Sequence, residues 1–566
     1  MAVDFSVYAD VFLAVMRYLG PILIGLILLR CAWPLLTFRR EVEVWAWLTM
    51  EDGSRLPITH WESVIGKSKR CDIVMNYPNI SRNHAVLTRF DDGSWMISDA
   101  ESREGITVNG EAVDACAIYQ DDVIGIGGVE MHFQPITAAQ ERKLNSLRTK
   151  ASNGWTGIAN LLLLSALQAL SVAAFLLGGS GEYASSILIG YGGLFLLQWL
   201  LFFLYGAIRK PAFELETLAF LLCSMGMAAI CTVTPGEALK QLVSTALGVV
   251  TFMILGWSMR DLERAKVVRY IAAVGGVLLL IAVLVFGKEY YGAKNWLVIA
   301  GFSLQPSELA KVCFVYVGAS TIDRLLRKRN IILFILYTVS LCGLLALMND
   351  FGTAMIFFCA FLMIAFLRSG SVGTVALACT ALGFAGVIGL KIAPHAMRRL
   401  TAWRHIWEDP YNTGYQQTRA LMCIASGGLL GLGIGQGKMK TIFAADSDMV
   451  FATLSEEWGL IAAILLVLCI LVFALFALRS AMMGRSSFYT IGSCTAAGIL
   501  VVQTAFNVLG TVDVLPLTGV TLPFVSNGGS SMICVWGLLA FIKAADTRAD
   551  ASFAVRLRRG RRGKGV

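Results

Sequence analysis

The chain has 566 residues, of which 57% are hydrophobic and 15% charged, and its net charge is +9. A soluble protein usually has about 25% charged residues, so this composition excludes an ordinary soluble enzyme and predicts many membrane spans. The thirteen cysteines include no Cys-x-x-Cys pair and no histidine stands near them at metal-ligand spacing. A disulfide framework or a zinc site is therefore not expected.

Charge divides the chain into two parts. Residues 41–135 contain 7 Lys and Arg residues against 16 Asp and Glu residues, whereas the rest of the chain contains 40 against 22. We therefore expect one acidic, water-soluble domain within an apolar, basic membrane protein.

Membrane spans are expected wherever about 20 apolar residues follow one another. The first run lacks a basic start and a small-residue cleavage site, so residues 1–40 are expected to remain as an anchor. A basic linker at 136–155 should lead to two additional spans in 156–210, ten spans in 211–546 and a basic tail at 547–566. The thirteen expected spans cover about 11–38, 156–179, 183–207, 212–234, 239–257, 268–286, 303–321, 330–348, 352–368, 372–390, 450–478, 486–511 and 529–545.

Positive charge predicts the orientation of these spans. Arg39 and Arg40 end the anchor, and every connection expected on that side carries Lys or Arg. The positive-inside rule then places the N-terminus outside and both the acidic domain and the C-terminus in the cytoplasm of a bacterial cell membrane. The exception is the expected outer loop 391–449, which carries seven Lys and Arg residues. They suggest an anionic ligand such as phosphate, although long loops also cross membranes regardless of charge.

Residues 41–135 alternate apolar and polar positions in short runs separated by turn signals, which predicts an all-β sandwich of about ten strands. The spacing of Gly66-Lys67, Ser81-Arg82-Asn83-His84 and Asn109-Gly110 resembles that of the forkhead-associated (FHA) domain, a reader of phosphothreonine peptides. The resemblance implies that Lys67 and Ser81 contact the phosphate, that Arg82 holds the peptide and that His84 supports the loop from within. With Asn109, these residues form the expected phosphopeptide site.

Two positions depart from the FHA pattern. Lys67 replaces the usual arginine and cannot make its bidentate contact. Glu104 stands where an asparagine usually contacts the peptide, and its carboxylate would repel a phosphate. The alternative to phosphopeptide binding is a docking module whose basic patch is only solvated.

Three polar clusters fall where lipid would disfavour them. Glu308 and Lys311 share one helix face, so the pair is expected to face the bundle interior as a binding site or as a structural ion pair. Asp448 stands directly before an apolar helix, where capping that helix is its alternative role. Residues 515–531 contain two prolines and three glycines. Irregular backbone of this kind persists at membrane depth only inside protein or beside a cavity.

The motifs around these clusters resemble the SEDS family of polytopic proteins, named FtsW/RodA/SpoVE, over about 212–545. They are GAKNWL at 292–297, QPSELAK at 305–311, NDFGTA at 349–354, DSDMVFATLSEEWG at 446–459 and LPLTGVTLPFVSNGGSS at 515–531. The resemblance implies a polytopic α-helical fold with a ten-span core. It also implies a peptidoglycan glycosyltransferase that polymerises lipid II, releases undecaprenyl pyrophosphate and works with a class B penicillin-binding protein.

The family's essential aspartate matches Asp448, which we expect to be the general base on the acceptor 4-hydroxyl. A histidine usually stands two residues earlier, where this chain has Asp446, and this second carboxylate could raise the pKa of Asp448 or help hold Mg²⁺ or Mn²⁺. The residues expected to bind the substrate or its pyrophosphate are Trp296, Glu308, Lys311, Arg398, Arg399, Arg404, Gln416, Ser526, Gly528 and Gly529.

Two other functions remain open from the residues alone: a lipid II flippase and a non-catalytic division scaffold. The halves 212–368 and 372–545 share no interrupted-helix pattern, which disfavours an inverted-repeat transporter. The polar clusters gather on the outer side, which favours chemistry there. The FHA domain is then expected to be a regulatory module that docks phosphothreonine-bearing division proteins, and no nucleic-acid partner is expected. Division, elongation and sporulation are not distinguished.

Overall fold

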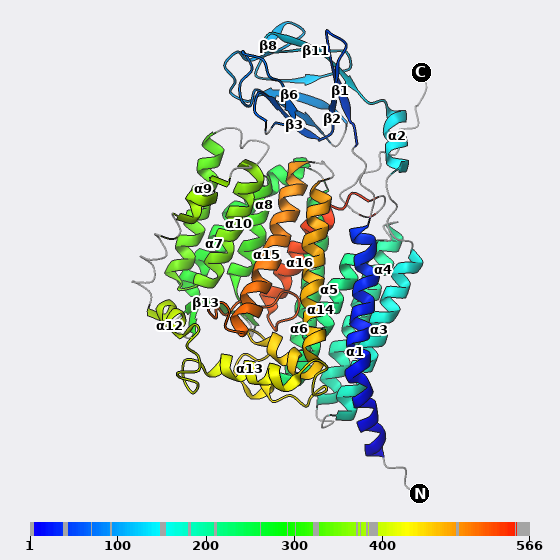
Figure 1. Ribbon diagram of the computed structural model, residues 1–566, viewed down its shortest axis with the longest axis vertical. Helices are drawn as coiled ribbons and strands as arrows, with labels where there is room; N and C mark the ends of the chain where they lie inside the picture. The colour runs from blue at the N-terminus through cyan, green and yellow to red at the C-terminus, as the bar shows by residue number, and fades with distance from the viewer. Residues whose placement is uncertain are drawn as a thin grey trace.

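A bundle of long helices carries a β-sandwich on one of its ends, as the computed structural model shows (Figure 1). The structure describes residues 5–37, 43–69, 71–90, 93–147, 154–178, 183–208, 212–260, 262–290, 293–299, 302–320, 328–369, 372–373, 375–380, 383, 394–482, 486–548 and 551.

The sandwich consists of two sheets, with strand orders β2-β1-β11-β10-β7-β8 and β4-β3-β5-β6-β9. Its strands alternate inward apolar residues with outward polar ones, and Leu48, Leu87 and Phe133 are buried between the sheets. The all-β prediction for 41–135 is confirmed. The strands are β1 (Ala46–Met50), β2 (Arg55–Ile58), β3 (Glu62–Gly66), β4 (Ile73–Val74), β5 (Ala85–Arg89), β6 (Trp95–Asp99), β7 (Ile106–Val108), β8 (Glu111–Val113), β9 (Ala115–Ile118), β10 (Val123–Ile126) and β11 (Val129–Pro135).

Nine helices within the described ranges are long and apolar enough to cross a membrane, and the apolar parts of α9 and α16 are shorter. The polytopic helical prediction is thus confirmed, whereas the count of thirteen stays a prediction because most of the expected span 372–390 lies outside the described residues. The apolar helices are α1 (Phe5–Leu36), α3 (Gly154–Gly178), α4 (Ala184–Ala207), α5 (Glu214–Val233), α6 (Ala238–Ser258), α7 (Leu262–Phe286), α8 (Pro306–Ser320), α9 (Lys328–Leu347), α10 (Phe351–Ser369), α14 (Val450–Ala481), α15 (Ser487–Thr511) and α16 (Gly529–Ala544).

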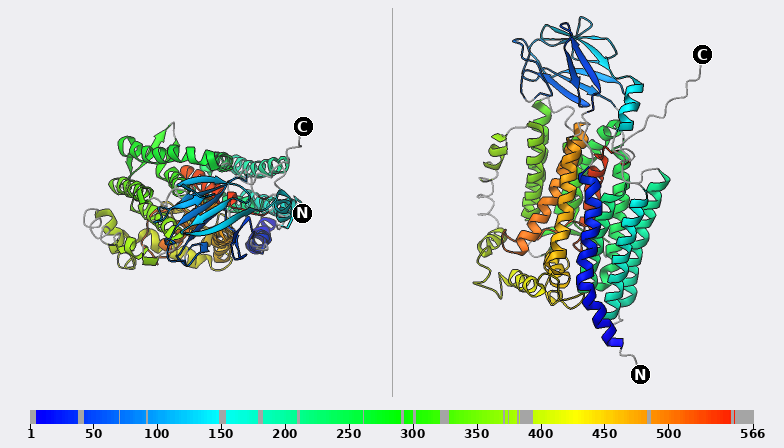
Figure 2. Two further views of the ribbon diagram at one scale, coloured as in Figure 1. Left: turned by 90° about the horizontal axis from the view of Figure 1, so that it is seen from above. Right: turned by 45° about the vertical axis from the view of Figure 1, so that its right-hand side comes forward.

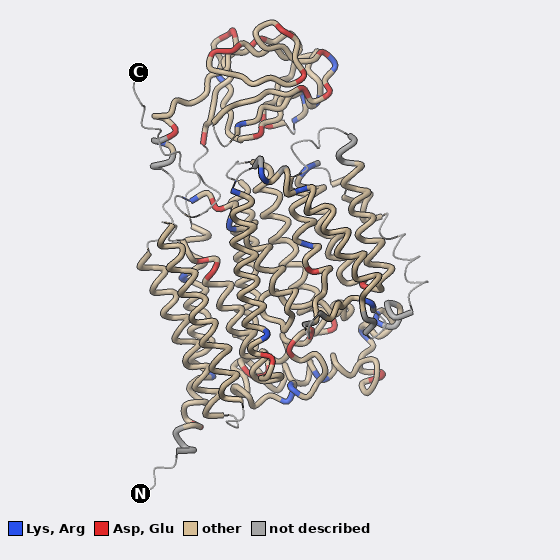
Figure 3. Tube along the Cα trace, turned by 180° about the vertical axis from the view of Figure 1, so that it is seen from behind, with Lys and Arg blue, Asp and Glu red and all other residues tan. Residues whose placement is uncertain are grey.

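The polar helices lie at the two ends of this bundle. Helix α2 (Ala138–Leu147) follows the sandwich, whereas α12 (Pro394–Ala402) and α13 (Tyr415–Gly427) lie at the opposite end (Figure 1). Charged residues are sparse along the middle of the bundle and gather at its ends and in the sandwich (Figure 3). This distribution is the one that a bilayer around the bundle would require.

Helices α1, α3 and α4 stand side by side along one flank of the bundle (Figure 2). Gln168 of α3 and Gln198 of α4 exchange two hydrogen bonds of 3.1 and 3.0 Å, and Gln168 also donates to Ser224 of α5. Hydrogen-bonded amides of this kind join helices where lipid offers no alternative partner.

The start of one expected span is a strand and not a helix. The expected span at 303–321 begins only at Pro306, because Phe302–Leu304 forms strand β14 of a small antiparallel sheet with β12 (Lys288–Tyr290) and β13 (Ala293–Ile299). Proline has no backbone N–H to donate and so fits the first position of a helix. The sequence analysis did not predict this sheet.

Buried ion pairs join α5 to α16 and the segment after it, at the end of the bundle that carries the sandwich. Lys543 lies 3.1 Å from the carboxylate of Glu216, and both side chains are fully buried. Arg548 lies 2.8 Å from Asp546 and 3.4 Å from Glu214. Each of these buried ions is stabilised by the opposite charge beside it. Removal of one ion would leave its partner as an unpaired charge in the protein interior, which is strongly destabilising.

We therefore expect the Lys543→Met substitution to lower the free energy of unfolding by about 3 to 5 kcal/mol, since it leaves Glu216 without its cation. The measurement is thermal unfolding in detergent. The matched control is Lys240→Met, because Lys240 forms an exposed pair with Glu237 at 2.7 Å and should change stability by under about 1 kcal/mol. Equal melting temperatures for the two variants would contradict a stabilising role for the buried pair.

Candidate functional site

Asp448 lies directly before α14, which packs against α13, and α13 lies at the end of the bundle opposite the sandwich (Figure 1). Met449 occupies the N-cap position of α14, and no side chain caps the helix. Asp448 therefore makes no capping hydrogen bond, and the electrostatic effect of its charge on the helix N-terminus stays an alternative role. Its side chain is half-buried, and within the described part of the chain no hydrogen bond reaches its carboxylate oxygens.

Hydrogen bonds fix the backbone on which Asp448 stands. Asn507 of α15 donates from its side-chain amide to the carbonyl oxygens of Asp448 and Val520, at 2.9 and 2.8 Å. The Ser526 hydroxyl donates to the Ser447 carbonyl at 2.7 Å and accepts from the Leu522 N–H at 2.8 Å. The irregular segment 515–531 is thus tied to the residues before α14.

Arg399 approaches Asp448 from α12, across Gly519. Its Nη1 donates to the Thr518 carbonyl at 3.0 Å. A Cβ added to Gly519 would lie 3.4 Å from Oδ2 of Asp448 and 3.8 Å from Nη1 of Arg399. Gly519 also has a φ of +70°, which side chains rarely adopt. The carboxylate and the guanidinium therefore converge on a position that only glycine leaves open.

The surroundings of Asp448 raise its pKa to about 6. Burial is the largest cause, Asp446 raises the pKa further, and the positive charge of Arg399 opposes both. The effect of Asp446 has the direction that the sequence suggested. A carboxylate with this pKa is ionised at neutral pH and binds a proton more strongly than an exposed aspartate, which suits a general base.

Asp446 has a different environment. Its Oδ2 accepts hydrogen bonds from the Thr234 hydroxyl at 2.7 Å and from the Asn527 amide at 2.9 Å, and its carbonyl oxygen accepts from the Asn527 N–H at 2.8 Å. Asp446 therefore joins the end of α5 to the segment before α16. Of the two carboxylates, Asp448 is the one left available for a substrate.

The Glu308–Lys311 pair lies on α8, on the other flank of segment 515–531. The Lys311 Nζ lies 2.8 Å from the Glu308 carboxylate, and Lys311 is only 1% exposed. The adjacent Gln305 donates from its N–H to the Ser530 hydroxyl at 3.0 Å and from its side chain to Asp350 at 3.3 Å. The pair thus faces the protein interior, as expected, and Lys311 donates to Oε1 of Glu308, whereas Oε2 of Glu308 is buried without a hydrogen-bond partner among the described residues.

Asp350 is a buried carboxylate that the sequence analysis did not single out. Burial raises its pKa, while hydrogen bonds from Thr353 oppose this shift. Next to it, a Cβ added to Gly352 would lie 3.0 Å from the Thr518 carbonyl oxygen. The start of α10 therefore contacts segment 515–531 close to Arg399. The sequence signal was the acidic residue of the NDFGTA motif between two apolar runs.

The other expected substrate residues are more dispersed. Arg404 places its guanidinium 5.4 Å from the Trp403 ring centroid, and no described contact joins it to Asp448. Gln416 donates to the Phe443 carbonyl at 3.1 Å and so holds the loop before Asp448. Trp296 is half-buried in β13 opposite Lys288.

Gly528 and Gly529 begin α16, and Gly529 lies against Ser244 of α6. The side chain of Arg398 lies outside the described part of the structure. The structure therefore brings Arg399 and Ser526 to Asp448 but does not do so for Arg404 or Trp296. Asn507 and Gln417 were missed, although Gln417 is buried and donates to the Gly510 carbonyl at 2.8 Å.

No group of three or more His, Cys, Asp or Glu side chains that could hold a metal ion occurs among the described residues. Asp446 and Asp448 are two neighbouring carboxylates, and Asp446 is already occupied by two donors. These residues alone do not fit a resident Mg²⁺ or Mn²⁺, so we assign no step to a metal.

In the sandwich, backbone hydrogen bonds bring together the loops of the expected phosphopeptide site. The Lys67 N–H donates to the Ser81 carbonyl at 2.9 Å, and the Ser81 hydroxyl accepts from the Arg103 N–H at 3.1 Å. His84 is fully buried, where its Nδ1 accepts from the Ser81 N–H and its Nε2 lies 2.9 Å from the Gly105 carbonyl.

The side chains of Lys67 and Arg82 are exposed beside Ser81, as an anion site needs. Asn109 differs from the expectation, because its side chain is bonded to Asp122 and to the Val123 N–H. It therefore ties the turn between β7 and β8 to the start of β10.

Comparison with known proteins identifies both parts of the chain. Residues 63–127 match the FHA domain, and residues 215–550 match the FtsW/RodA/SpoVE family of cell cycle proteins. A probable peptidoglycan glycosyltransferase FtsW from Wigglesworthia glossinidia brevipalpis is 30% identical over 313 residues, which cover 52% of this chain and 79% of that protein. The peptidoglycan glycosyltransferase RodA of Mycobacterium bovis is 28% identical over 328 residues, covering 54% of this chain and 69% of RodA.

Among solved structures, a chain from a peptidoglycan synthase complex that coordinates polymerization and crosslinking is 25% identical and has a TM-score of 0.49. The match covers 58% of this chain and 96% of that one. The family match covers more than half of the sequence, and the motifs around Asp448 fall within it. The chain is therefore a member of the FtsW/RodA/SpoVE family that also carries an FHA domain.

Proposed function

We propose that this protein is a peptidoglycan glycosyltransferase that polymerises lipid II, with Asp448 as its general base. One observation carries the proposal: the carboxylate of Asp448 and the guanidinium of Arg399 converge on Gly519. This carboxylate is half-buried, has a raised pKa and has no hydrogen-bond partner among the described residues. The relatives of this chain are named peptidoglycan glycosyltransferases. A base and a cation on one open position are what glycosyl transfer to a pyrophosphate-activated donor requires.

In the proposed reaction, Asp448 accepts the proton of the 4-hydroxyl on the acceptor sugar. The freed oxygen forms a bond to C1 of the donor sugar while the bond from C1 to the pyrophosphate oxygen breaks. Undecaprenyl pyrophosphate leaves with the electron pair. Negative charge develops on this leaving group, so a cation near it stabilises the transition state more than the ground state.

Arg399 is better placed than Lys311 to supply that cation. Lys311 is enclosed with Glu308, whereas Arg399 has one described hydrogen bond, to the Thr518 carbonyl, and lies beside the carboxylate across Gly519. A guanidinium also offers several donors in one plane, which suits phosphate oxygens. The roles expected for Lys311, Arg398 and Arg404 in pyrophosphate binding stay predictions.

The FHA domain is proposed to dock phosphothreonine proteins on the cytoplasmic side, with the N-terminus outside and the C-terminus inside. The sandwich lies at one end of the helix bundle, and α12, whose Arg399 lies beside Asp448, and α13 lie at the other (Figure 1), which supports chemistry on one side of the membrane and docking on the other. A class B penicillin-binding protein is the proposed partner, because the glycan strands that a polymerase of this family makes need a second enzyme to crosslink them.

We expect Asp448→Asn to reduce lipid II polymerisation by about 10²-fold or more, because the amide cannot accept the hydroxyl proton. The measurement is glycan-strand formation by the purified full-length protein in detergent or vesicles. Asp446→Asn is the matched control, because an amide oxygen can still accept from Thr234 and Asn527. Full activity of Asp448→Asn would refute the assignment, and lipid II flipping without polymerisation by the wild type would favour the transporter.

The dependence of lipid II polymerisation on pH should follow the protonation of Asp448. As pH falls through about 6, Asp448 becomes protonated in the folded protein and polymerisation should fall with it. Asp446→Asn removes a charge that raises this pKa, so the acidic limb of kcat/KM should move to lower pH. Arg399→Gln removes a charge that lowers it, so the limb should move to higher pH and kcat should fall. Identical acidic limbs in all three proteins would exclude Asp448 as the titrating group.

For the sandwich, we expect Lys67→Ala and Ser81→Ala each to weaken binding of a phosphothreonine peptide by about tenfold or more, because a charge-assisted contact to the phosphate is lost. Isothermal calorimetry on the full-length protein would measure it, with the unphosphorylated peptide as reference. Arg55→Ala, on the exposed face of β2, is the control and should leave binding unchanged. A wild-type domain that binds both peptides equally would instead support docking by a solvated basic patch.

A further inference from the structure

Helix α14 is broken close to Asp448. Its helical backbone is interrupted at Gly459, whose φ of 86° belongs to the left-handed region. The break divides α14 into a short half at 450–458, which follows directly on Asp448, and a long half at 460–481. The orientation of the short half therefore sets where the carboxylate lies relative to Arg399 and Gly519.

A glycine-rich segment, 427–437, packs against the break. The N–H groups of Leu432 and Gly433 donate to the carbonyls of Glu456 and Glu457, at 2.8 and 3.1 Å. The contact is too close for side chains, because a Cβ on Gly431 would lie 2.1 Å from the Glu457 carbonyl oxygen. The glycines thus serve backbone pairing at the break, and the sequence's weak phosphate signal in this loop has a structural explanation.

Carboxylates of the short half hold it to the core. Glu457 accepts from the Thr232 hydroxyl of α5 at 2.8 Å, and Glu456 accepts from the Met439 N–H at 2.8 Å. These contacts lie within the part of the chain that matches the FtsW/RodA/SpoVE family.

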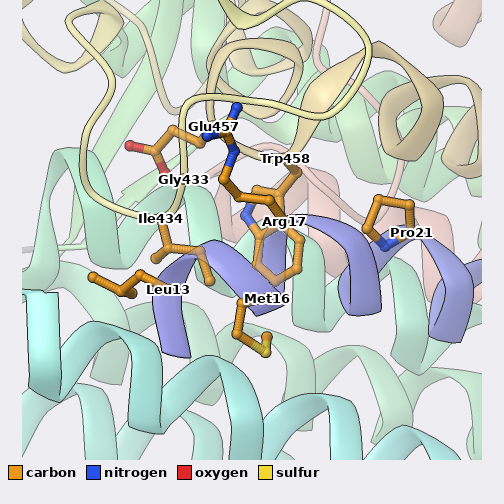
Figure 4. Close-up of a pocket in the computed structure, with 8 residues that line it drawn as sticks. All are labelled: Leu13, Met16, Arg17, Pro21, Gly433, Ile434, Glu457 and Trp458. Atoms are coloured by element: carbon orange, nitrogen blue, oxygen red, sulfur yellow. The ribbon is translucent and has the colours of Figure 1, made fainter. Parts of the chain in front are cut away.

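A further contact comes from α1, which lies outside the matched part. Gly20 of α1 faces Trp458, and a Cβ at Gly20 would lie 3.0 and 3.2 Å from two atoms of the ring. Trp458 is 4% exposed, and its indole nitrogen has no partner among the described residues, so packing alone holds the ring. Figure 4 shows Trp458 against α1 between Arg17 and Pro21, beside the glycine-rich loop at Gly433.

We propose that the contact of Gly20 with Trp458 positions the short half of α14, and through it Asp448, for glycosyl transfer. Gly20 and Trp458 are thus positioning residues, and this inference rests on the proposed function of Asp448. A shift of about 1 Å in a reacting group can reduce a rate about 10²-fold, so a small displacement of Trp458 should be measurable. The left-handed residue Gly459 is the joint at which the short half would move.

The first test is Gly20→Leu in the full-length protein, with lipid II polymerisation as readout. We expect kcat to fall at least about tenfold, with KM for lipid II within about twofold, because the base is displaced while the substrate pocket persists. Gly25→Leu is the matched control on the same helix, since a Cβ there meets Leu465 of α14 at an ordinary 3.6 Å. Wild-type kinetics for Gly20→Leu would overturn the proposal, and so would equal losses in both variants.

A second variant separates positioning from general damage to the fold. Trp458→Leu removes the ring that the larger side chain at position 20 would meet. Gly20→Leu should then have less than about a twofold effect on kcat in the Trp458→Leu background, whereas independent damage would multiply the two losses. Multiplied losses, or a melting temperature lowered only in Gly20→Leu, would show a structural role and overturn the proposal.

A third measurement does not depend on catalysis. In Asp448→Cys, the rate of thiol modification by a water-soluble maleimide reports the exposure of position 448, after subtraction of labelling in the parent protein. Gly20→Leu should change this rate at least about threefold and Gly25→Leu should not. An unchanged rate would refute positioning by α1 even where the polymerase assignment holds. A changed rate in a protein whose wild type makes no glycan would refute the proposed function alone.

Discussion

The site depends on one constraint: irregular backbone inside a membrane protein must find hydrogen-bond partners within the protein. Before α16 begins at Gly529, segment 515–531 forms no regular helix, and side chains such as that of Asn507 on α15 bond its backbone instead. Asn507 alone satisfies two carbonyls, one in this segment and one at Asp448. The same bonds that make the irregular backbone tolerable therefore also fix the aspartate, so the stability of the segment and the geometry of the site cannot vary separately.

The sequence predicted the architecture because its strongest signals are local. Alternation with turn residues predicted the sandwich, apolar runs predicted the helices, and the motif at 446–459 pointed to Asp448. Asn507 and Gln417 could not be found in this way, because the carbonyl groups of Asp448 and Gly510 to which they donate lie 59 and 93 positions away in sequence. The break in α14 was also hidden, since one glycine next to a long apolar run does not interrupt the helical pattern.

The cations of the loop 391–449 show a second limit of sequence. Arg399 and Arg404 have the same charge and lie five positions apart, so composition gives them equal standing. In the structure Arg399 reaches segment 515–531, whereas Arg404 adopts a φ of 63° and places its guanidinium near Trp403. Packing between α12 and segment 515–531 places Arg399, and not Arg404, beside the Asp448 carboxylate. The local sequence around the two arginines does not contain this information.

The two carboxylates before α14 show how environment separates roles. Asp446 accepts two hydrogen bonds at one carboxylate oxygen, and these bonds occupy it. Asp448 is desolvated without such bonds, and burial outweighs Arg399 in its pKa. If Arg399 were in full contact with Asp448, the ion pair would lower proton affinity and weaken the base. Arg399 instead donates to Thr518 across Gly519, which keeps the cation near the developing negative charge while the carboxylate retains its affinity for a proton. A glycine at 519 is therefore as much a requirement of the chemistry as the two charged groups that it separates.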